Sequence, residues 1–297
     1  MANGSPATLR IGLVGTGYWA RATHATGLRA QPAVSLTGVW GRDRAATAAV
    51  AAEFGIAGYA SFEELLDEVD AVGFSVPPHV QSELATRAAE RGKHLLLEKP
   101  VAVTERAAAG LAGAVAEAGV ASVVFFTSRF DAARRAWLAD RAAQTGWDGA
   151  SGLWLGSAFE AGSPFDTPWR HDKGGLWDVG PHALSLLAGA LGPIAGVTAR
   201  AGHRDLVQLL VEHSSGALAS YALSIDTPAA SRTSLLVWGS PGSFELPPGP
   251  GDPAACLATA AGELATAAAA PGAGHPCDVR FGHRVVQLLA EAERQLS

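Results

Sequence analysis

The sequence predicts an α/β protein built from a parallel sheet covered by helices on both faces, followed by a largely antiparallel sheet. In the first 130 residues, short and almost wholly apolar runs alternate with runs of helical length. This alternation is typical of parallel strands joined by crossover helices. In the second half, short Gly and Ser turns such as 214–216 join the apolar runs, which favours antiparallel hairpins. The length of 297 residues fits about two domains.

The first half supplies strands and helices in alternation. The strands are expected at 9–14, 34–40, 71–76, 94–97 and 120–127. The helices are expected at 18–30, 45–54, 63–68, 80–91 and 104–118. Pro77 and Pro78 end the third strand, because proline donates no hydrogen bond to a sheet ladder.

The second half differs in its joins and in its helices. Its strands are expected at 152–160, 197–201, 206–213, 217–225 and 233–238, and its helices at 181–191, 254–269 and 279–296. A Gly- and Pro-rich loop is expected at 271–276. We place the domain boundary at residue 128, giving domains 1–128 and 129–297. The last helix belongs to the second domain in this division, and packing of this helix against the first domain is compatible with it.

Composition and charge exclude several classes of protein. Apolar residues make up 48% and charged residues 17% of the chain, which excludes a mainly disordered protein. The formal net charge of −6 offers no basic face for nucleic acid. The sequence has no apolar run of about 18 residues, so we expect no membrane span. The N-terminal MANGSPATLR lacks the pattern of a secretory signal. The two cysteines, Cys256 and Cys277, favour a reduced, cytoplasmic protein.

A glycine-rich turn joins the first strand to the first helix. Gly15, Gly17 and Ala20 follow the pattern G-x-G-x-x-A. The first glycine permits a tight turn, the second lets a pyrophosphate approach the backbone, and the alanine permits close helix–sheet packing. The free N–H groups of the helix N-terminus then face the anion. The motif predicts dinucleotide binding, and a tight turn without a ligand is the alternative.

The end of the second strand bears on which dinucleotide binds. Gly41 lies where an acid for the ribose hydroxyls is expected, so a 2′-phosphate is not repelled there. Arg42 can pair with that phosphate or cover the adenine. This arrangement favours NADP over NAD. In the alternative, Arg42 is a solvated turn residue and Asp43 turns in to bind NAD.

Two further elements carry groups suited to proton transfer. Glu98 and Lys99 follow the strand 94–97, at the carboxyl end where ligands bind in open α/β sheets. Asp178 and His182 are four residues apart, so they share one face if both are helical. A carboxylate beside an imidazole orients it as a proton donor and acceptor. Pro181 suits a first helical turn, so Asp178 fits the turn before the helix, and an N-cap with a packed histidine is the alternative.

These elements together resemble the Gfo/Idh/MocA oxidoreductase family over nearly the whole chain. The resemblance is carried by GLVGTGYWA near the start, GKHLLLEKP at 92–100, SRFD at 128–131, Trp169-Arg170 and GGLWDVGPH at 174–182. HPCDVRFG and the last helix also fit the C-terminal end of that family. The resemblance implies a Rossmann domain with a doubly wound parallel sheet, followed by an α+β domain with an open, mostly antiparallel sheet. That sheet often forms homodimers or homotetramers.

The resemblance also implies roles for single residues. Lys99, Asp178 and His182 are the expected catalytic residues. With the turn residues above, the expected cofactor contacts are Gly15, Thr16, Gly17, Tyr18, Trp19, Gly41, Arg42, Val76, Pro77, Glu98, Lys99, Trp169 and Arg170. Pro78 and Gln81 stand where the family frequently has Asn and His, which leaves backbone rather than side-chain contacts near the nicotinamide.

The implied activity is NAD(P)-dependent hydride transfer to or from a sugar, polyol or related hydroxyl or carbonyl compound. Lys99 and His182 would transfer protons, and Asp178 would orient the substrate or His182. Two alternatives stay open: an NAD-dependent glycoside hydrolase or lyase that oxidises its substrate transiently, and a non-catalytic dinucleotide-binding regulator. No metal is expected, because the spacing of His275, Cys277, Asp278 and His283 fits no common zinc pattern.

Overall fold

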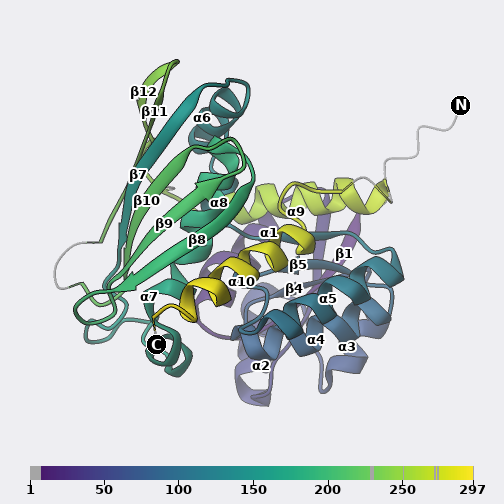
Figure 1. The fold of residues 1–297 in the computed structure, drawn as a ribbon. Helices are drawn as coiled ribbons and strands as arrows, with labels where there is room; N and C mark the ends of the chain where they lie inside the picture. Colours follow the sequence, from purple (N-terminus) through teal and green to yellow (C-terminus); the bar gives the residue numbers. More distant parts are fainter. Residues whose placement is uncertain (1–7, 228–230, 250, 271, 273, 297) are drawn as a thin grey trace, which may run out of the picture. The chain divides into compact units, whose positions relative to one another are not determined.

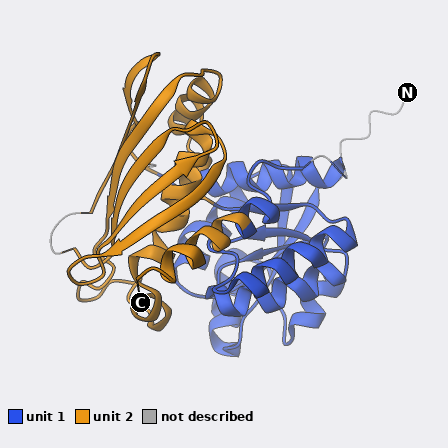
Figure 2. Cartoon of the chain, in the orientation of Figure 1, with its two compact units in different colours: residues 1–125, 252–283 blue, residues 126–251, 284–297 orange. Residues whose placement is uncertain are grey.

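The computed structural model describes residues 8–227, 231–249, 251–270, 272 and 274–296. The chain forms two compact units (Figure 2). The first comprises Met1–Phe125 and Asp252–His283, and the second comprises Phe126–Gly251 and Arg284–Ser297. The domain boundary expected at residue 128 stays a prediction. The two compact units divide the chain differently, because residues 252–283 belong to the same unit as the N-terminal residues.

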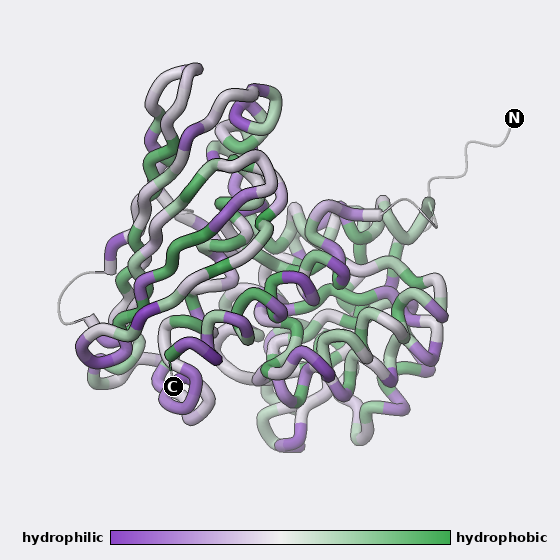
Figure 3. The backbone as a smooth tube through the Cα atoms, viewed as in Figure 1, coloured by the Kyte–Doolittle hydropathy of each residue, from purple (hydrophilic) through white to green (hydrophobic). Residues whose placement is uncertain are grey.

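The first unit contains a six-stranded, wholly parallel sheet. In sheet order its strands are β3 (Ala57–Gly58), β2 (Val34–Trp40), β1 (Leu9–Val14), β4 (Ala71–Phe74), β5 (His94–Leu97) and β6 (Ser122–Val124). The order reverses direction between β1 and β4, and ligands of open α/β sheets bind at such a reversal. The strands expected at 9–14, 34–40 and 94–97 are confirmed residue for residue. Figure 3 shows that these strands carry mainly hydrophobic residues.

Helices cover this parallel sheet on both faces (Figure 1). They are η1 (Ala20–Ala25), α1 (Thr26–Ala30), α2 (Arg44–Phe54), α3 (Phe62–Glu68), α4 (Pro78–Glu90), α5 (Glu105–Ala118) and α9 (Pro253–Ala269). α1 packs on α9, and α4 packs on α5. Side-chain caps explain several starts: Asp43, Ser61 and Thr104 accept hydrogen bonds from the first-turn N–H groups of α2, α3 and α5. The helix expected at 18–30 forms, but its η1 segment is π-helical.

The second unit contains a six-stranded mixed sheet. In sheet order its strands are β12 (Gly242–Glu245), β11 (Arg232–Gly239), β7 (Trp147–Leu155), β10 (Leu218–Ser224), β9 (Val207–His213) and β8 (Ile194–Ala201). Only the described pair β7–β10 is parallel, so the sheet is mostly antiparallel, as predicted. Its helices are α6 (Ala132–Ala142), α7 (Pro168–Asp178) and α8 (Gly180–Leu191). α10 (Val279–Glu293) contains residues of both units.

One face of this second sheet carries exposed side chains. Along β9, buried Val207, Leu209 and Val211 alternate with exposed residues. The register pairs Leu210 of β9 with Ser220 of β10. Leu218 lies two residues before Ser220 on β10 and therefore points to the same exposed face. Leu210 is 42% exposed and Leu218 is 49% exposed. The sheet is therefore open on one face.

Several elements differ from the sequence predictions. α6, α7, β3 and β12 were not expected. α7 was missed because the Gly174-Gly175 pair indicates a turn, and Gly174 indeed has a non-helical conformation inside it. β7 spans Trp147–Leu155 instead of 152–160, since Asp148 and Gly149 interrupt its apolar pattern. The loop expected at 271–276 lies partly outside the described residues. Among the helices in the described part of the chain, none is long and apolar enough to cross a membrane.

Candidate functional site

The glycine turn is fixed by backbone contacts to neighbouring strands. Gly15 has φ +127°, and a Cβ there would lie 2.3 Å from the carbonyl oxygen of Ser75. The Gly15 N–H donates to the carbonyl of Trp40 at 2.9 Å. Only glycine therefore fits at the first position of the motif.

Gly17 has different surroundings. It is exposed, and apart from Gly17 itself and its two chain neighbours, no heavy atom of the described residues lies within 4 Å of the position that its Cβ would take. The backbone is thus open to a ligand at the second glycine, where the motif needs space for a pyrophosphate. The turn fits a dinucleotide: the fold requires glycine at position 15, and Gly17 leaves space for a ligand beside the backbone.

Position 41, at the end of β2, is crowded where an acidic residue is expected. A Cβ on Gly41 would lie 2.8 Å from Cγ2 of Thr16, so a longer residue would displace that threonine. Asp43 caps α2, accepting from the N–H groups of Ala45 and Ala46 at 2.8 and 3.0 Å. Arg42 between them is exposed. In this structure Asp43 serves as a helix cap.

The lysine turn follows β5 and is held by a buried glutamine. Gln81 of α4 is 0% exposed. Its Nε2 donates to the Glu98 carbonyl at 2.8 Å, and its Oε1 accepts from the Glu98 N–H at 2.7 Å. Nε2 also lies 3.3 Å from the carbonyl oxygen of Pro100, which follows Lys99 through a cis peptide bond. Sequence reasoning treated Gln81 as a departure from a motif, whereas the side chain fixes the backbone on both sides of Lys99.

The Glu98 carboxylate is held by groups from two segments. Its Oε1 accepts from Nε1 of Trp19 at 2.7 Å and lies 2.8 Å from Nε2 of His24. Its Oε2 accepts from the Lys99 N–H at 3.1 Å. Trp19 was an expected cofactor contact, and His24 had no expected role. The cluster joins the helix after the glycine turn to the lysine turn.

The expected site residues of the first unit gather at one edge of its sheet. The glycine turn, Gly41 and Lys99 follow the carboxyl ends of β1, β2 and β5. Val76 and Pro77 follow β4 and are partly exposed. Because these strands are neighbours in one parallel sheet, the segments lie along the same edge.

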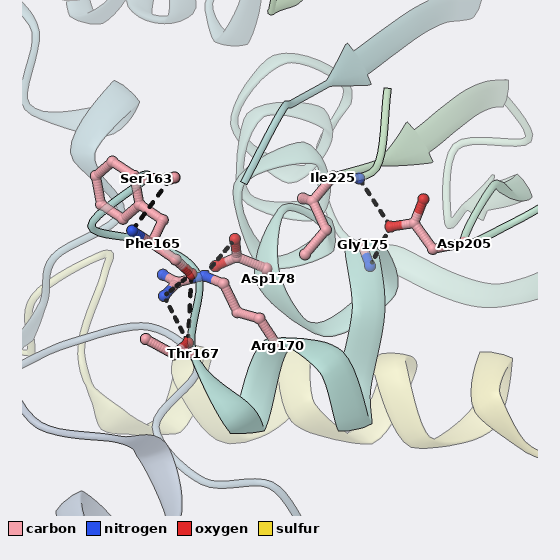
Figure 4. A network of polar contacts seen from close by, with 8 residues as sticks. All are labelled: Ser163, Phe165, Thr167, Arg170, Gly175, Asp178, Asp205 and Ile225. Carbon is pink, nitrogen blue, oxygen red and sulfur yellow. Dashed lines mark hydrogen bonds and ion pairs between the residues drawn. The ribbon is translucent and has the colours of Figure 1, made fainter. Parts of the chain in front are cut away.

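In the second unit, Asp178 is paired with an arginine (Figure 4). Nε of Arg170 donates to Oδ2 of Asp178 at 2.9 Å, and the two side chains are 15% and 10% exposed. Nη1 of Arg170 also donates to the Phe165 carbonyl and to Oγ1 of Thr167. Its guanidinium lies 4.6 Å from the ring centroid of Trp169. Arg170 thus fixes the Asp178 carboxylate in a partly buried ion pair.

His182 lies in the first turn of α8, directly after Pro181. Asp178 ends α7, so the two residues lie on successive helices rather than on one continuous helix. The His182 ring stacks on Trp154 of β7, with centroids 4.8 Å apart and an interplanar angle of 13°. His182 is 8% exposed. The stacking fixes the plane of the imidazole.

A residue that sequence reasoning missed, Asp205, holds the kink before Asp178. Gly174 has φ +62° inside α7, and the next N–H, of Gly175, donates to Oδ2 of Asp205 at 3.1 Å. The same carboxylate accepts from the Ile225 N–H at 2.8 Å and from the Ser224 hydroxyl at 2.5 Å. A Cβ on Gly175 would lie 2.9 Å from Cα of Ser224. Asp205 therefore ties the kinked helix to the end of β10.

The residues considered as metal ligands have other roles. Within the described ranges, no three His, Cys, Asp or Glu side chains gather as a metal site. Nε2 of His275 lies 2.7 Å from Oε2 of Glu263, and Asp278 accepts from the N–H groups of Arg280 and Phe281 at the start of α10.

Comparison with known proteins points to one family. The family described as "Oxidoreductase family, NAD-binding Rossmann fold" matches residues 9–126, and the "GFO/IDH/MocA C-terminal domain" matches residues 153–245. The chain is 33% identical over 141 residues to galactose 1-dehydrogenase of Pseudomonas fluorescens, covering 46% of this chain and 44% of that protein. It is 32% identical over 205 residues to D-xylose 1-dehydrogenase (NADP(+)) 2 of Haloferax volcanii, covering 63% and 61%. The matches thus span about half of these relatives' own length.

The solved structures share the fold. Levoglucosan dehydrogenase in complex with NADH and levoglucosan superposes with a TM-score of 0.83 at 18% identity, covering 97% of both chains. This likeness extends over both units, and the two family matches lie one in each. The chain belongs to the Gfo/Idh/MocA family of oxidoreductases, with its NAD-binding Rossmann fold.

Proposed function

We propose that this protein is an NAD(P)-dependent oxidoreductase that transfers hydride between a nicotinamide cofactor and a sugar, polyol or related hydroxyl or carbonyl compound. The observation that carries the proposal is the carboxyl edge of the parallel sheet, where an open Gly17 turn and the fixed Lys99 turn follow strands of one sheet. Relatives named as galactose and xylose dehydrogenases support the substrate class.

The proposed roles follow from the local geometry. The N–H groups of the glycine turn and the helix that follows it hold the pyrophosphate. Residues 1–128 bind the dinucleotide and residues 129–297 bind the substrate. The nicotinamide, when bound, accepts or donates the hydride. In the oxidative direction the substrate hydroxyl gives its proton to His182 or Lys99, and in the reductive direction the same groups donate it.

Asp178 has a positioning role in this proposal. Its carboxylate is held by Arg170 at 2.9 Å, so it is presented as a fixed acceptor. We assign it to orient a substrate hydroxyl or His182. Trp169 and Arg170, expected as cofactor contacts, stack on each other, and this pair supports the carboxylate.

For the cofactor we propose NADP in preference to NAD. An acidic residue at position 41 would have to displace Thr16, Asp43 is engaged as a helix cap, and exposed Arg42 is available to a 2′-phosphate. A relative named as NADP(+)-linked supports this preference.

A fluorescence titration with NADPH and with NADH tests the cofactor preference. We expect NADPH to bind about tenfold more tightly, and Arg42→Ala to remove most of that difference, because a charge-assisted pair to phosphate contributes roughly 1.5–3 kcal/mol. Arg44→Ala, two residues further on at the start of α2, is the matched control. Tighter binding of NADH by the wild type would contradict the preference.

A further inference from the structure

The strongest unassigned feature is the buried pair of His24 and Glu98. His24 is 0% exposed, and the Glu98 side chain is 13% exposed. Glu98 precedes Lys99 in sequence, and its carboxylate accepts from the Lys99 backbone N–H at 3.1 Å. Burying an ionisable pair is costly unless its hydrogen bonds are satisfied. The carboxylate meets that condition through Trp19, His24 and the Lys99 N–H.

The surroundings of His24 fix its tautomer. Nδ1 is buried and has no hydrogen-bond partner among the described residues, so it has no acceptor for a proton. Nε2 lies 2.8 Å from Oε1 of Glu98, and a carboxylate only accepts hydrogen bonds. The proton of a neutral His24 ring is therefore on Nε2 and is donated to Glu98. The edge-on ring of Phe125, with its centroid 6.0 Å away, encloses the imidazole on another side.

The backbone places His24 for this contact. It lies in the π-helical segment η1, which begins directly after Trp19. Such segments are rare and frequent at functional sites, because the extra residue in the turn redirects side chains. Trp19 and His24 thereby reach the same Glu98 oxygen from one helix.

We propose that His24 and Glu98 are positioning residues that hold the Lys99 turn, an inference that rests on the proposed function. The Trp19 indole, His24 and the Lys99 N–H all contact the Glu98 carboxylate. This arrangement holds the Lys99 backbone, because Oε2 of the fixed carboxylate accepts from the Lys99 N–H. It also joins the lysine turn to the helix that follows the dinucleotide turn.

The test compares matched variants of two buried histidines. His24→Leu removes the donor to Glu98 while filling the space, and His24→Gln retains an N–H donor near the position of Nε2. His213→Leu is the control, because His213 is 3% exposed and its ring has the Gly192 carbonyl as its one hydrogen-bond partner among the described residues. Steady-state kinetics with the best substrate of an aldose and polyol panel, thermal melts and cofactor titrations are measured for each.

We expect His24→Leu to lower kcat by roughly tenfold to 100-fold, as small misplacements of a catalytic group do. The substrate KM and the cofactor Kd should change less than about twofold, since the His24 side chain is 0% exposed and a positioning residue acts on kcat. His24→Gln should recover most of kcat, and His213→Leu should lower the melting temperature while leaving kcat unchanged. A folded His24→Leu protein with the kcat of the wild type would overturn the inference.

A second readout needs no turnover. In the cofactor-free protein, nitrogen NMR of the His24 ring should show the proton on Nε2, and the Trp19 indole N–H signal should move in His24→Leu. A proton on Nδ1 would overturn the pairing. Failure of the proposed function has a different signature: full activity of Lys99→Met, or no turnover at all, while these NMR signals are as expected.

Discussion

Lys99 and His182 are each held by contacts to neighbouring residues. Lys99 is fixed through its backbone, by Glu98 directly and by Gln81 through the adjoining peptides. His182 is fixed by the face of its ring, which stacks on Trp154. A proton-transfer group works best when it is oriented in advance, because its transition-state geometry then costs little reorganisation.

The first prediction concerns these two residues. Lys99→Met and His182→Ala should each lower kcat by roughly 100-fold or more, which is the usual contribution of a positioned general acid or base. Cofactor affinity measured by fluorescence titration should barely change. His203→Ala, at an exposed position in the loop before β9, serves as the control and should retain full activity. Undiminished turnover in both variants would refute the assignment.

The residues that sequence reasoning found and missed differ in a physical way. Lys99, Asp178 and His182 stand in contiguous motifs, so their types and spacing are visible in one sequence. Gln81 and Asp205 act by binding backbone N–H and C=O groups. Every residue has such groups, so no sequence pattern marks the partners.

At the scale of elements, the kink in α7 decides where Asp178 lies. The turn at Gly174 has a conformation that L side chains rarely adopt, and the Asp205 carboxylate binds the next N–H. The same carboxylate fastens the end of β10 through Ser224 and Ile225. One side chain thus joins a helix, a strand end and the β8–β9 loop.

Asp205→Ala should therefore affect both stability and activity. It leaves several N–H and O–H groups without their acceptor, which should lower the free energy of unfolding by on the order of 1–3 kcal/mol. We also expect a lower kcat in the folded variant, because Asp178 follows the kink. Asp140→Ala on α6 is the control, since its side chain is 72% exposed and such surface pairs contribute little. Denaturant titration and kinetics check both effects, and an Asp205→Ala protein as stable and active as Asp140→Ala would contradict this role.

One buried histidine, His213, and one partly buried histidine, His94, predict how stability depends on pH. Burial lowers the pKa of His213 and of His94 below the ordinary value. Nδ1 of His94 accepts from the Ala121 N–H at 2.9 Å, which protonation of that atom would break. Since both rings bind protons more weakly in the folded state, the stability they contribute is present above about pH 6.5 and falls as the pH drops below it.

The free energy of unfolding should thus decrease between about pH 7 and about pH 5. His213→Leu should make that decrease smaller, because one proton-binding difference is removed. Urea titrations of the wild type and the variant at several pH values measure both slopes. If the free energy of unfolding of the variant fell equally or more steeply with decreasing pH, His213 would not contribute to the pH dependence of stability.

Element prediction succeeded where burial imposes a pattern. β1, β2 and β5 each lie between two other strands of the parallel sheet, and their apolar runs predict their ends to the residue. The π-helical turn of η1 and the short edge strands β3 and β12 depend on tertiary contacts, so local sequence carries no sign of them.

At the scale of the whole molecule, the open sheet face is the proposed surface for self-association. Leu210, Leu218 and Trp238 are 42%, 49% and 36% exposed, and the register places them on one face. Exposed apolar groups on one face often mark an interface. We propose a homodimer or homotetramer formed through this face.

Light scattering of the purified protein tests this association. We expect the mass of a dimer or tetramer for the wild type and a smaller mass for Leu210→Glu/Leu218→Glu, because charges buried in an apolar interface are strongly unfavourable. Circular dichroism confirms that the variant is folded. A monomeric wild type would contradict the proposed interface.

The central claim is hydride transfer to or from a sugar or polyol. The most direct measurement incubates the protein with NADP⁺ or NAD⁺ and a panel of aldoses and polyols, and follows the absorbance of reduced nicotinamide against Lys99→Met. We predict substrate-dependent reduction of the cofactor, faster with NADP⁺ than with NAD⁺ and lost in Lys99→Met. Cofactor binding without turnover, or substrate consumption with no net change in cofactor absorbance, would contradict it and favour a regulator or a transiently oxidising hydrolase or lyase.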